Sequence, residues 1–498
     1  MARLVYLCLL AGAAALLYFL LTTSPWARQG ELRFEPVDLD PTRTYVLEYW
    51  DYDYPLASEA YPDYDRFVRA MITAFNQRYP NVQVKYRLLD FSTGWEELQA
   101  ALASGRPPDV YATWWDHPPV VHPLGVPVDP YLDEETQADY FPVAWSLASH
   151  RGSYWGWPRW VTPIFFYGHI EALQGLGAEA EEVIPEGLSW QALLELGQAA
   201  GEPVLACAAP GTLFRQLMLA QGIPSLLADD GRSLWGGQEF ERAAEWIERL
   251  SRDGLLKGTN PDGRDKESGA LEAFLRGEVA VVGGLNPAAA HLVLAWLQGP
   301  EQREPTAGLI PGQPDHEGRG ISVRPRPAPP SEPRGTDPED GRRGNPRAEG
   351  TVSLMPVPAP ADVGALPVLG VGAVVVFRHA DYRGLEQTQA AMEFARHVSQ
   401  WRTAAPATSF LGVPALRASA EVWFTQAPLT PSQATYLYEV LVEAADLGYV
   451  RYPSAQVTID ERPIIREEVV PLLDDLWYGE VTAGEAVRRI LELEVRSE

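Results

Sequence analysis

The chain has 498 residues, and its 67 acidic side chains outnumber its 40 basic ones, which gives a formal net charge of −27. This length predicts two or three folding units, and the 46% of hydrophobic residues suffices for a core in each. The acidity argues against a nucleic-acid partner and against broad contact with anionic lipid, because both require a basic face. Only two cysteines occur, and Cys8 lies in the apolar N-terminus, so Cys207 is left without a disulfide partner and a cysteine-based metal site is excluded.

The N-terminus carries an export signal. Arg3 precedes an apolar run from Leu4 to Leu21. This run is longer than the usual core of a signal peptide and just long enough to span a bilayer, so residues 1–27 are either a cleaved signal peptide or a retained membrane anchor. Pro25 lies where a signal peptidase prefers a small residue, which slightly favours the anchor. We therefore expect an extracytoplasmic protein, in the periplasm or on the outer face of the cell membrane.

Strand and helix patterns alternate through the next part of the chain. Strands are predicted at 45–50, 82–88 and 109–112, and helices at 67–75 and 95–103. Such alternation predicts an α/β unit with a parallel sheet, in which ligands bind beyond the carboxyl ends of the strands.

In the second half of the chain, the sequence pattern predicts helices, two strands and one insertion. Strand patterns occur at 279–283 and 372–377, among helical stretches such as 190–200 and 240–250. Residues 300–350 contain 11 Pro, 8 Gly and 8 Arg and no aromatic residue. This composition has too little apolar surface to offset the entropy of ordering, so we expect a disordered insertion there.

Several segments, taken in their order along nearly the whole exported chain, match the pattern of a known family. They are AFNQRYPNVQVKY (74–86), LQAALASGRPPDVYATWW (98–115), YWGWPRWVTPIFFYGHIEALQGLG (154–177), AFLRGEVAVVGG (273–284), AAMEFARHVSQW (390–401), GVPALRAS (412–419) and YGEVTAGEAVRRI (478–490). Together they resemble the extracellular solute-binding proteins of ABC importers, in the sugar-binding family related to maltose-binding protein. The sequence departs from that family at residues 284–287, where a tryptophan is usual, and at residues 167–168, where a Tyr-Asn pair is usual.

The resemblance implies an α/β, two-lobed, periplasmic-binding-protein-like fold with hinge strands and a helical C-terminal part. Lobe I would comprise residues 42–158 and 284–378. Lobe II, richer in helices, would comprise residues 159–283 and 379–498. In such a fold the ligand is clamped between the lobes when they close.

Aromatic residues gather in three short stretches, at 50–54, 114–116 and 154–160. A sugar presents apolar faces edged by hydroxyls, so its site combines flat rings with fixed polar groups. The predicted ligand contacts are Trp50, Asp51, Tyr52, Asp53, Trp114, Trp115, Asp116, Tyr154, Trp157, Arg159, Trp160, Trp235 and Asn286. Packing inside the fold is the alternative for every ring, and it is the favoured role for Trp157, Trp160 and Trp235.

Two chemical alternatives are weaker. Asp51 and Asp53 resemble the paired carboxylates of a glycosidase, but they are too close in sequence to flank a glycosidic bond in the usual way. Asp116, His117 and His122 offer zinc ligands, yet the prolines among them indicate a stiff surface loop. No metal and no cofactor are expected.

These observations favour a non-enzymatic, monomeric binding protein. It would capture a neutral mono- or oligosaccharide and deliver it to the membrane-embedded permease subunits of an ABC importer. The alternatives are a secreted carbohydrate-active hydrolase and an anchored subunit that presents a bound ligand to a membrane sensor.

Overall fold

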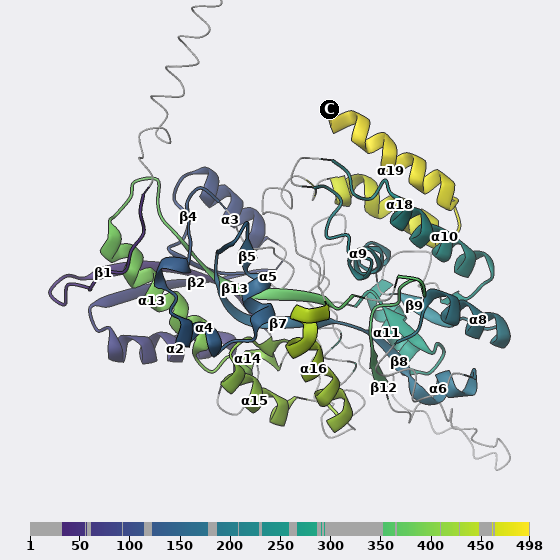
Figure 1. Ribbon diagram of the computed structural model, residues 1–498, viewed down its shortest axis with the longest axis horizontal. Helices are drawn as coiled ribbons and strands as arrows, with labels where there is room; N and C mark the ends of the chain where they lie inside the picture. Colours follow the sequence, from purple (N-terminus) through teal and green to yellow (C-terminus); the bar gives the residue numbers. More distant parts are fainter. Residues whose placement is uncertain are drawn as a thin grey trace, which may run out of the picture.

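Two lobes, each built around one β-sheet, lie end to end in the protein (Figure 1). The structure is a computed structural model. It describes residues 32–54, 56, 61–91, 93–113, 122–177, 187–207, 209–228, 232–257, 266–285, 290, 293, 352–363, 366–408, 410–427, 429–447, 461 and 464–497. The predicted export segment (residues 1–27) and the predicted insertion (300–350) lie outside these ranges. Within the described parts, no helix combines the length and apolar character that crossing a bilayer requires.

The lobe I sheet is mixed rather than purely parallel. Its strands follow the order β14 (Val413–Pro414), β7 (Trp157–Ile164), β13 (Val368–Phe377), β3 (Val110–Ala112), β1 (Tyr45–Tyr52) and β2 (Val82–Leu89), and β4 (Gly125–Val126) pairs with β13. β1 runs parallel to β2 and β3, as the alternating pattern predicted. β13 runs antiparallel to both β3 and β7 and lies between them. A strand from late in the chain therefore completes a sheet that is otherwise built mainly from residues 45–164.

Helices cover the sheet of lobe I. They are α2 (Tyr64–Arg78), α3 (Gly94–Ala103), η1 (Asp129–Tyr131), α4 (Glu134–Ala138), α5 (Pro142–Leu147), α13 (Leu385–Gln400), α14 (Ala404–Ala407), α15 (Arg417–Gln426) and α16 (Pro431–Leu447), beside the small hairpin of β5 (Ser149–His150) and β6 (Ser153–Tyr154). The Asp63 carboxylate caps α2 by accepting the Arg66 N–H at 2.8 Å. The apolar stripe of α2, which includes Phe67, Met71 and Phe75, is buried as its spacing predicted.

Lobe II repeats the plan with a five-stranded sheet. The strand order is β10 (Leu256–Lys257), β9 (Leu205–Cys207), β11 (Val281–Gly283), β8 (Phe166–His169) and β12 (Val352–Met355). Its helices are α6 (Ile170–Gly175), α8 (Trp190–Ala200), α9 (Pro210–Ala220), α10 (Gln238–Arg252), α11 (Lys266–Leu275), α18 (Val470–Trp477), preceded by a π-helical turn at Ile465–Val469, and α19 (Ala483–Ser497). The Ser189 hydroxyl caps α8, and Gly201 ends it in a left-handed conformation.

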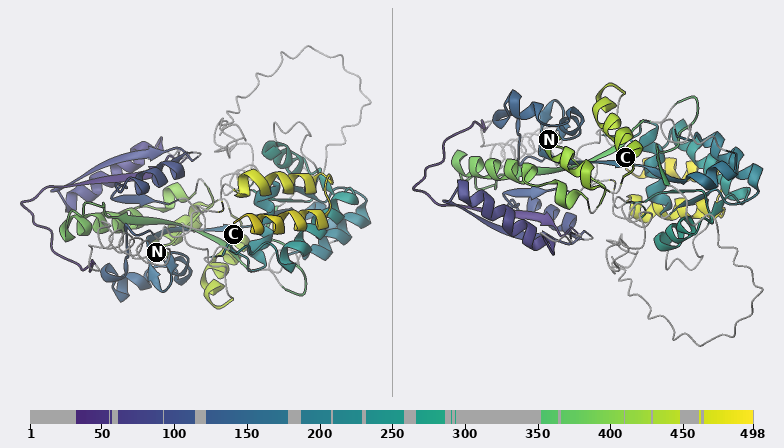
Figure 2. Two further views of the ribbon diagram at one scale, coloured as in Figure 1. Left: turned by 90° about the horizontal axis from the view of Figure 1, so that it is seen from above. Right: turned by 90° about the horizontal axis from the view of Figure 1, so that it is seen from below.

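The chain passes directly from one sheet to the other at two described places. β7 of lobe I continues into β8 of lobe II across Phe165, and β12 of lobe II leads to β13 of lobe I through residues 356–367. The two lobes remain separate bodies in both views of Figure 2. The two-lobed α/β fold with hinge strands is therefore confirmed.

The predicted division of the chain between the lobes needs correction. β7 stays in the lobe I sheet as far as Ile164, and β12 belongs to the lobe II sheet. Residues 385–426 were predicted in lobe II, but α13 packs on the lobe I sheet, where Phe394 meets Tyr49 edge-on at 5.1 Å. Among the described elements after α16, the π-helical turn at Ile465–Val469, α18 and α19 belong to lobe II, where α18 packs against α9 and α10 and α19 packs against α10 (Figure 1). The apolar stripe of α13 fits either sheet by composition, so tertiary packing decides its place.

Candidate functional site

A buried ion pair lies at the carboxyl end of β1. Arg159 Nη1 donates to Asp51 Oδ2 at 3.0 Å, and neither side chain is more than 1% exposed. The same oxygen accepts hydrogen bonds from the Tyr49 hydroxyl at 2.5 Å and the Tyr64 hydroxyl at 2.7 Å. Asp51 Oδ1 accepts the N–H of Tyr52 at 2.8 Å. Both oxygens of Asp51 therefore have protein partners, and the carboxylate holds β1, α2 and β7 together.

Electrostatics keep this network in one protonation state. Burial, followed by the Asp51 carboxylate, raises the pKa of Tyr49, and burial also raises the pKa of Tyr64. Burial, the largest single influence, would lower the pKa of Arg159, but Asp51 and the surrounding tyrosines together outweigh it and the pKa is raised. The phenols stay protonated donors and the guanidinium stays charged, so the network balances one positive charge against one negative charge.

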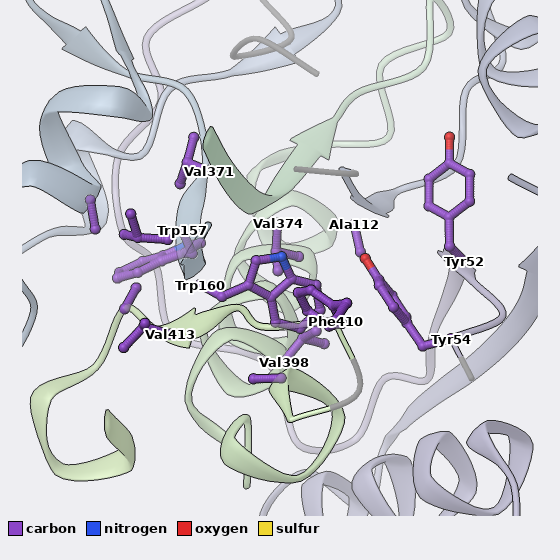
Figure 3. Packing of buried hydrophobic residues seen from close by; sticks show 14 of the residues in the cluster. Tyr52, Tyr54, Ala112, Trp157, Trp160, Val371, Val374, Val398, Phe410 and Val413 are labelled. Carbon is purple, nitrogen blue, oxygen red and sulfur yellow. The ribbon is translucent and has the colours of Figure 1, made fainter. Parts of the chain in front are cut away.

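A cluster of aromatic rings lies over this ion pair. The Tyr54 ring contacts Trp160 at 5.1 Å and Phe410 at 5.2 Å, and Trp160 meets Phe410 at 4.8 Å. Figure 3 shows these three rings turned toward one another, with Trp157 lying apart from them. We call Tyr54, Trp160 and Phe410 the ring cluster. Tyr52 continues it outward, because Tyr54 and Tyr52 both contact Phe91.

Trp160 is held from two sides. The Arg159 guanidinium lies 4.3 Å from its ring centroid, a cation–π contact. On β13, a Cβ atom at Gly372 would lie 2.0 Å from Trp160 Nε1, so only glycine allows this approach of ring to strand. Trp160 Nε1 is buried and has no hydrogen-bond partner among the residues that the structure describes.

Asp53 is the exposed carboxylate beside the ring cluster. Its N–H donates to the Leu89 carbonyl at 3.1 Å, which fixes its backbone at the end of β2. Partial burial and the nearby carboxylates, of which Asp63 is the strongest, raise the pKa of Asp53. Of the two aspartates that sequence reasoning singled out here, Asp53 is the one whose side chain reaches solvent.

The remaining predicted contacts on lobe I are more strongly engaged by the protein. Trp50 is 8% exposed, and its Nε1 donates to Glu48 Oε1 at 2.7 Å. Tyr154 is half-buried, and its hydroxyl accepts from Gln137 Nε2 at 2.9 Å. The Tyr52 hydroxyl bonds that of Tyr111 at 2.9 Å.

Two predicted tryptophans lie in cores. Trp157 packs edge-on against Trp145 at 5.7 Å, and Trp235 stacks on Phe240 at 5.7 Å in lobe II. Both follow the packing alternative that was favoured for them. Trp114, Trp115, Asp116 and Asn286 lie outside the described residues, so their predicted role stays a prediction.

Sequence reasoning placed Tyr54 in the aromatic stretch 50–54 but not among the ligand contacts, and it missed Tyr64, Phe91 and Phe410. Tyr54 and Tyr64 flank an aromatic and acidic stretch, which was a usable signal. Phe410 follows α14 with nothing in its sequence neighbourhood to distinguish it, and it reaches the ring cluster because β14, just after it, pairs with β7.

The described residues do not support the weaker alternative of a zinc site. His122 Nδ1 accepts the Leu124 N–H at 3.1 Å, and Asp116 and His117 lie outside the described ranges. Across the described residues, no group of three or more His, Cys, Asp or Glu side chains is arranged to hold a metal ion.

Residues 61–324 match the family model of bacterial extracellular solute-binding proteins. The match covers more than half of the 498 residues. The chain belongs to this family. The matched part of this solute-binding protein runs from α2 through the lobe II strands β8, β9 and β11, so it includes segments of both lobes.

Solved structures share the fold of this solute-binding protein at low sequence identity. The maltose-bound MalE3 of T. maritima has a TM-score of 0.57 and 15% identity, and the similarity covers 91% of this chain and 100% of that one. The sugar-binding protein MalE of Xanthomonas citri has a TM-score of 0.58 and 18% identity, with 91% and 96% covered. The GacH receptor of Streptomyces glaucescens, solved with and without acarbose, has a TM-score of 0.55 and 18% identity, with 91% and 98% covered. No curated protein sequence matches the chain.

Proposed function

We propose that this solute-binding protein is exported, captures a neutral saccharide between its two lobes and delivers it to an ABC permease. The family supports solute binding outside the cytoplasm. The proposal of a sugar rests chiefly on one observation: Asp53 reaches solvent where β1 ends, over a buried ring cluster that supports it, and the sequence continues β3 with the aromatic and acidic stretch Trp114, Trp115 and Asp116. Flat rings with a fixed polar neighbour suit the alternating apolar and hydroxyl-bearing surfaces of a sugar.

We assign the ligand contacts to residues that follow the strand ends. Asp53, Trp114, Trp115, Asp116 and Asn286 remain the proposed contacts. Asp51 and Arg159 become positioning residues, because each is buried and committed to partners that support Trp160. Solved relatives described as maltose-bound or as a cyclic alpha-maltosyl-1,6-maltose binding protein make α-linked glucosides a reasonable first panel.

The test is titration of the purified exported chain with mono- and oligosaccharides, followed by tryptophan fluorescence and calorimetry. We expect saturable binding of at least one neutral sugar. Trp114→Ala or Trp115→Ala should weaken it by about 1 to 3 kcal/mol per lost stack, by analogy with base stacking on aromatic rings. Trp401→Ala is the matched control, because Trp401 is half-buried against α2 and lies outside the proposed site. Silence toward every sugar, together with saturable binding of a peptide, would contradict the proposal.

The hydrolase alternative predicts turnover of a glycan. Asp51 does not suit a general acid or a nucleophile, because Arg159 and two phenols occupy its carboxylate. A bound sugar that is recovered unaltered after prolonged incubation would remove this alternative. Its conversion to a shorter product would overturn the binding-protein proposal.

A further inference from the structure

A half-open cavity lies on lobe I, away from the strand ends. It has a volume of about 120 Å³, is partly open to solvent, and is bordered by the N-terminal segment at Pro36, η1, the start of β7 and α13. None of its lining residues belongs to the ring cluster of Tyr54, Trp160 and Phe410. It is therefore a different place from the proposed saccharide site, and its argument is independent of the proposed function.

The charged wall of this cavity is already neutralised. Arg396 Nη2 donates to Glu393 Oε2 at 3.0 Å, and the same oxygen accepts the Tyr79 hydroxyl at 2.9 Å. Glu393 Oε1 accepts Gln389 Nε2 at 3.0 Å. With its two charges paired, this wall offers little net attraction to an ion.

Two hydrogen-bond donors in the wall have no acceptor. Trp157 Nε1 and the Tyr131 hydroxyl are both buried, and neither finds a partner among the described residues. Burial raises the pKa of Tyr131, so its hydroxyl keeps its proton. Buried donors are almost always paired in folded proteins, with protein, water or a ligand. This pair therefore points to an occupant that supplies acceptor oxygens.

The N-terminal segment forms one side of the cavity. The Val37 N–H donates to Gln389 Oε1 at 3.1 Å, and Phe34 packs edge-on against Tyr382 at 6.3 Å. Pro36 of this segment and Met392 of α13 both line the cavity and add apolar surface to it. An occupant thus meets two donors and two apolar side chains.

We propose that this cavity is a binding site for a small neutral molecule with an acceptor oxygen and a short apolar body, such as a short-chain amide. A dry cavity of about 150 Å³ admits benzene, so the volume here suits a molecule of about five or six non-hydrogen atoms. The donors Trp157 and Tyr131 bind its oxygen, and Pro36 and Met392 contact its apolar end.

The experiment uses the full exported chain labelled with ¹⁵N at its tryptophan indoles. Propionamide is titrated, and the Trp157 indole resonance is assigned by its loss in Trp157→Phe. We expect a saturable shift of this resonance with propionamide and at least a tenfold weaker response to propionate, which has the same size and a negative charge. Trp235 is the internal control, since its indole N–H is also buried without a partner among the described residues but lies in lobe II.

Two variants complete the test. Tyr131→Phe removes one donor and should weaken propionamide binding by about three- to tenfold, the usual worth of one hydrogen bond. Met392→Phe fills the cavity and should abolish the shift. If Met392→Phe does not fold, the Tyr131→Phe variant and the Trp235 control still test whether the cavity binds propionamide. A linear response, an equal shift at Trp235, or unchanged affinity in Tyr131→Phe would overturn the proposal and indicate that water alone occupies the cavity.

Discussion

Asp51 and Arg159 form a buried ion pair of 3.0 Å although 108 residues separate them in the sequence. The pair links the end of the first strand of lobe I to β7, the strand that leads into lobe II. Because the Arg159 guanidinium also lies against the ring of Trp160, the same contact supports the ring cluster. A residue pair that sequence reasoning placed at the ligand is thus part of the framework beneath it.

Asp51→Asn should destabilise the protein strongly. The substitution leaves the Arg159 charge buried without its partner, and losing one member of a buried pair costs about 3 to 5 kcal/mol. The double variant Asp51→Asn, Arg159→Met should recover part of that loss. Urea unfolding measures both. Glu272→Gln, in an exposed pair with Arg276, is the control and should change stability little. Additive effects of the two core substitutions would contradict the coupling.

Gly372→Ala should displace Trp160. The new methyl group would lie 2.0 Å from Trp160 Nε1, so the ring must move, and overpacking of a core costs about 1 to 3 kcal/mol. Gly484→Ala is the matched control. Its Cβ meets nothing within 4 Å, and alanine favours the helix by up to about 1 kcal/mol. Thermal unfolding and tryptophan emission check both variants. Equal stability of the two would show that the Trp160 ring moves away from residue 372 without cost.

Asp53→Asn should stabilise the protein at neutral pH but not in acid. The folded-state pKa of Asp53 is raised above its ordinary value of 3.8, so folding favours the protonated form. The stability that this proton contributes is complete below 3.8 and is lost as the pH rises through the folded-state pKa. The advantage of Asp53→Asn over the native chain should therefore grow upward from about pH 4 and then level off.

Asp133→Asn provides the control of opposite sign. Hydrogen bonds from Thr136 at the start of α4 lower the pKa of Asp133, so its carboxylate contributes stability above the ordinary value that disappears as the pH falls. Melting temperatures between pH 3 and pH 7 measure both variants. The same pH trend in the two would mean that the carboxylates near Asp53 do not repel it.

Phe410→Leu should affect stability and, given the proposed function, saccharide binding. The ring contacts with Tyr54 and Trp160 are lost at a cost of about 1 to 2 kcal/mol, while most of the apolar volume remains. Phe214→Leu removes a comparable ring contact in lobe II, with Phe240 at 5.7 Å. Calorimetric titration with the bound sugar should show weaker affinity only for Phe410→Leu. An equal loss of sugar affinity in both variants would show that the ring cluster does not support the ligand site.

The sequence by itself determined the α/β class through its periodicity, and the two lobes and the family through the resemblance of its ordered segments. Periodicity in strands and helices is local, and burial follows it, as in the apolar stripe of α2. It also indicated an aromatic and acidic stretch at the end of β1, because residue types that suit a sugar cluster there.

Tertiary structure alone decided which of those residues face one another. Asp51 and Asp53 are chemically identical and two residues apart, yet one is buried in an ion pair and the other reaches solvent. That difference depends on Arg159, which β13 and β7 bring across the sheet. The same is true of α13, whose apolar stripe suits either lobe, and of Phe410, which long-range packing alone brings to Trp160. Contacts between distant segments depend on the shape of both partners, and a local pattern specifies only one of them.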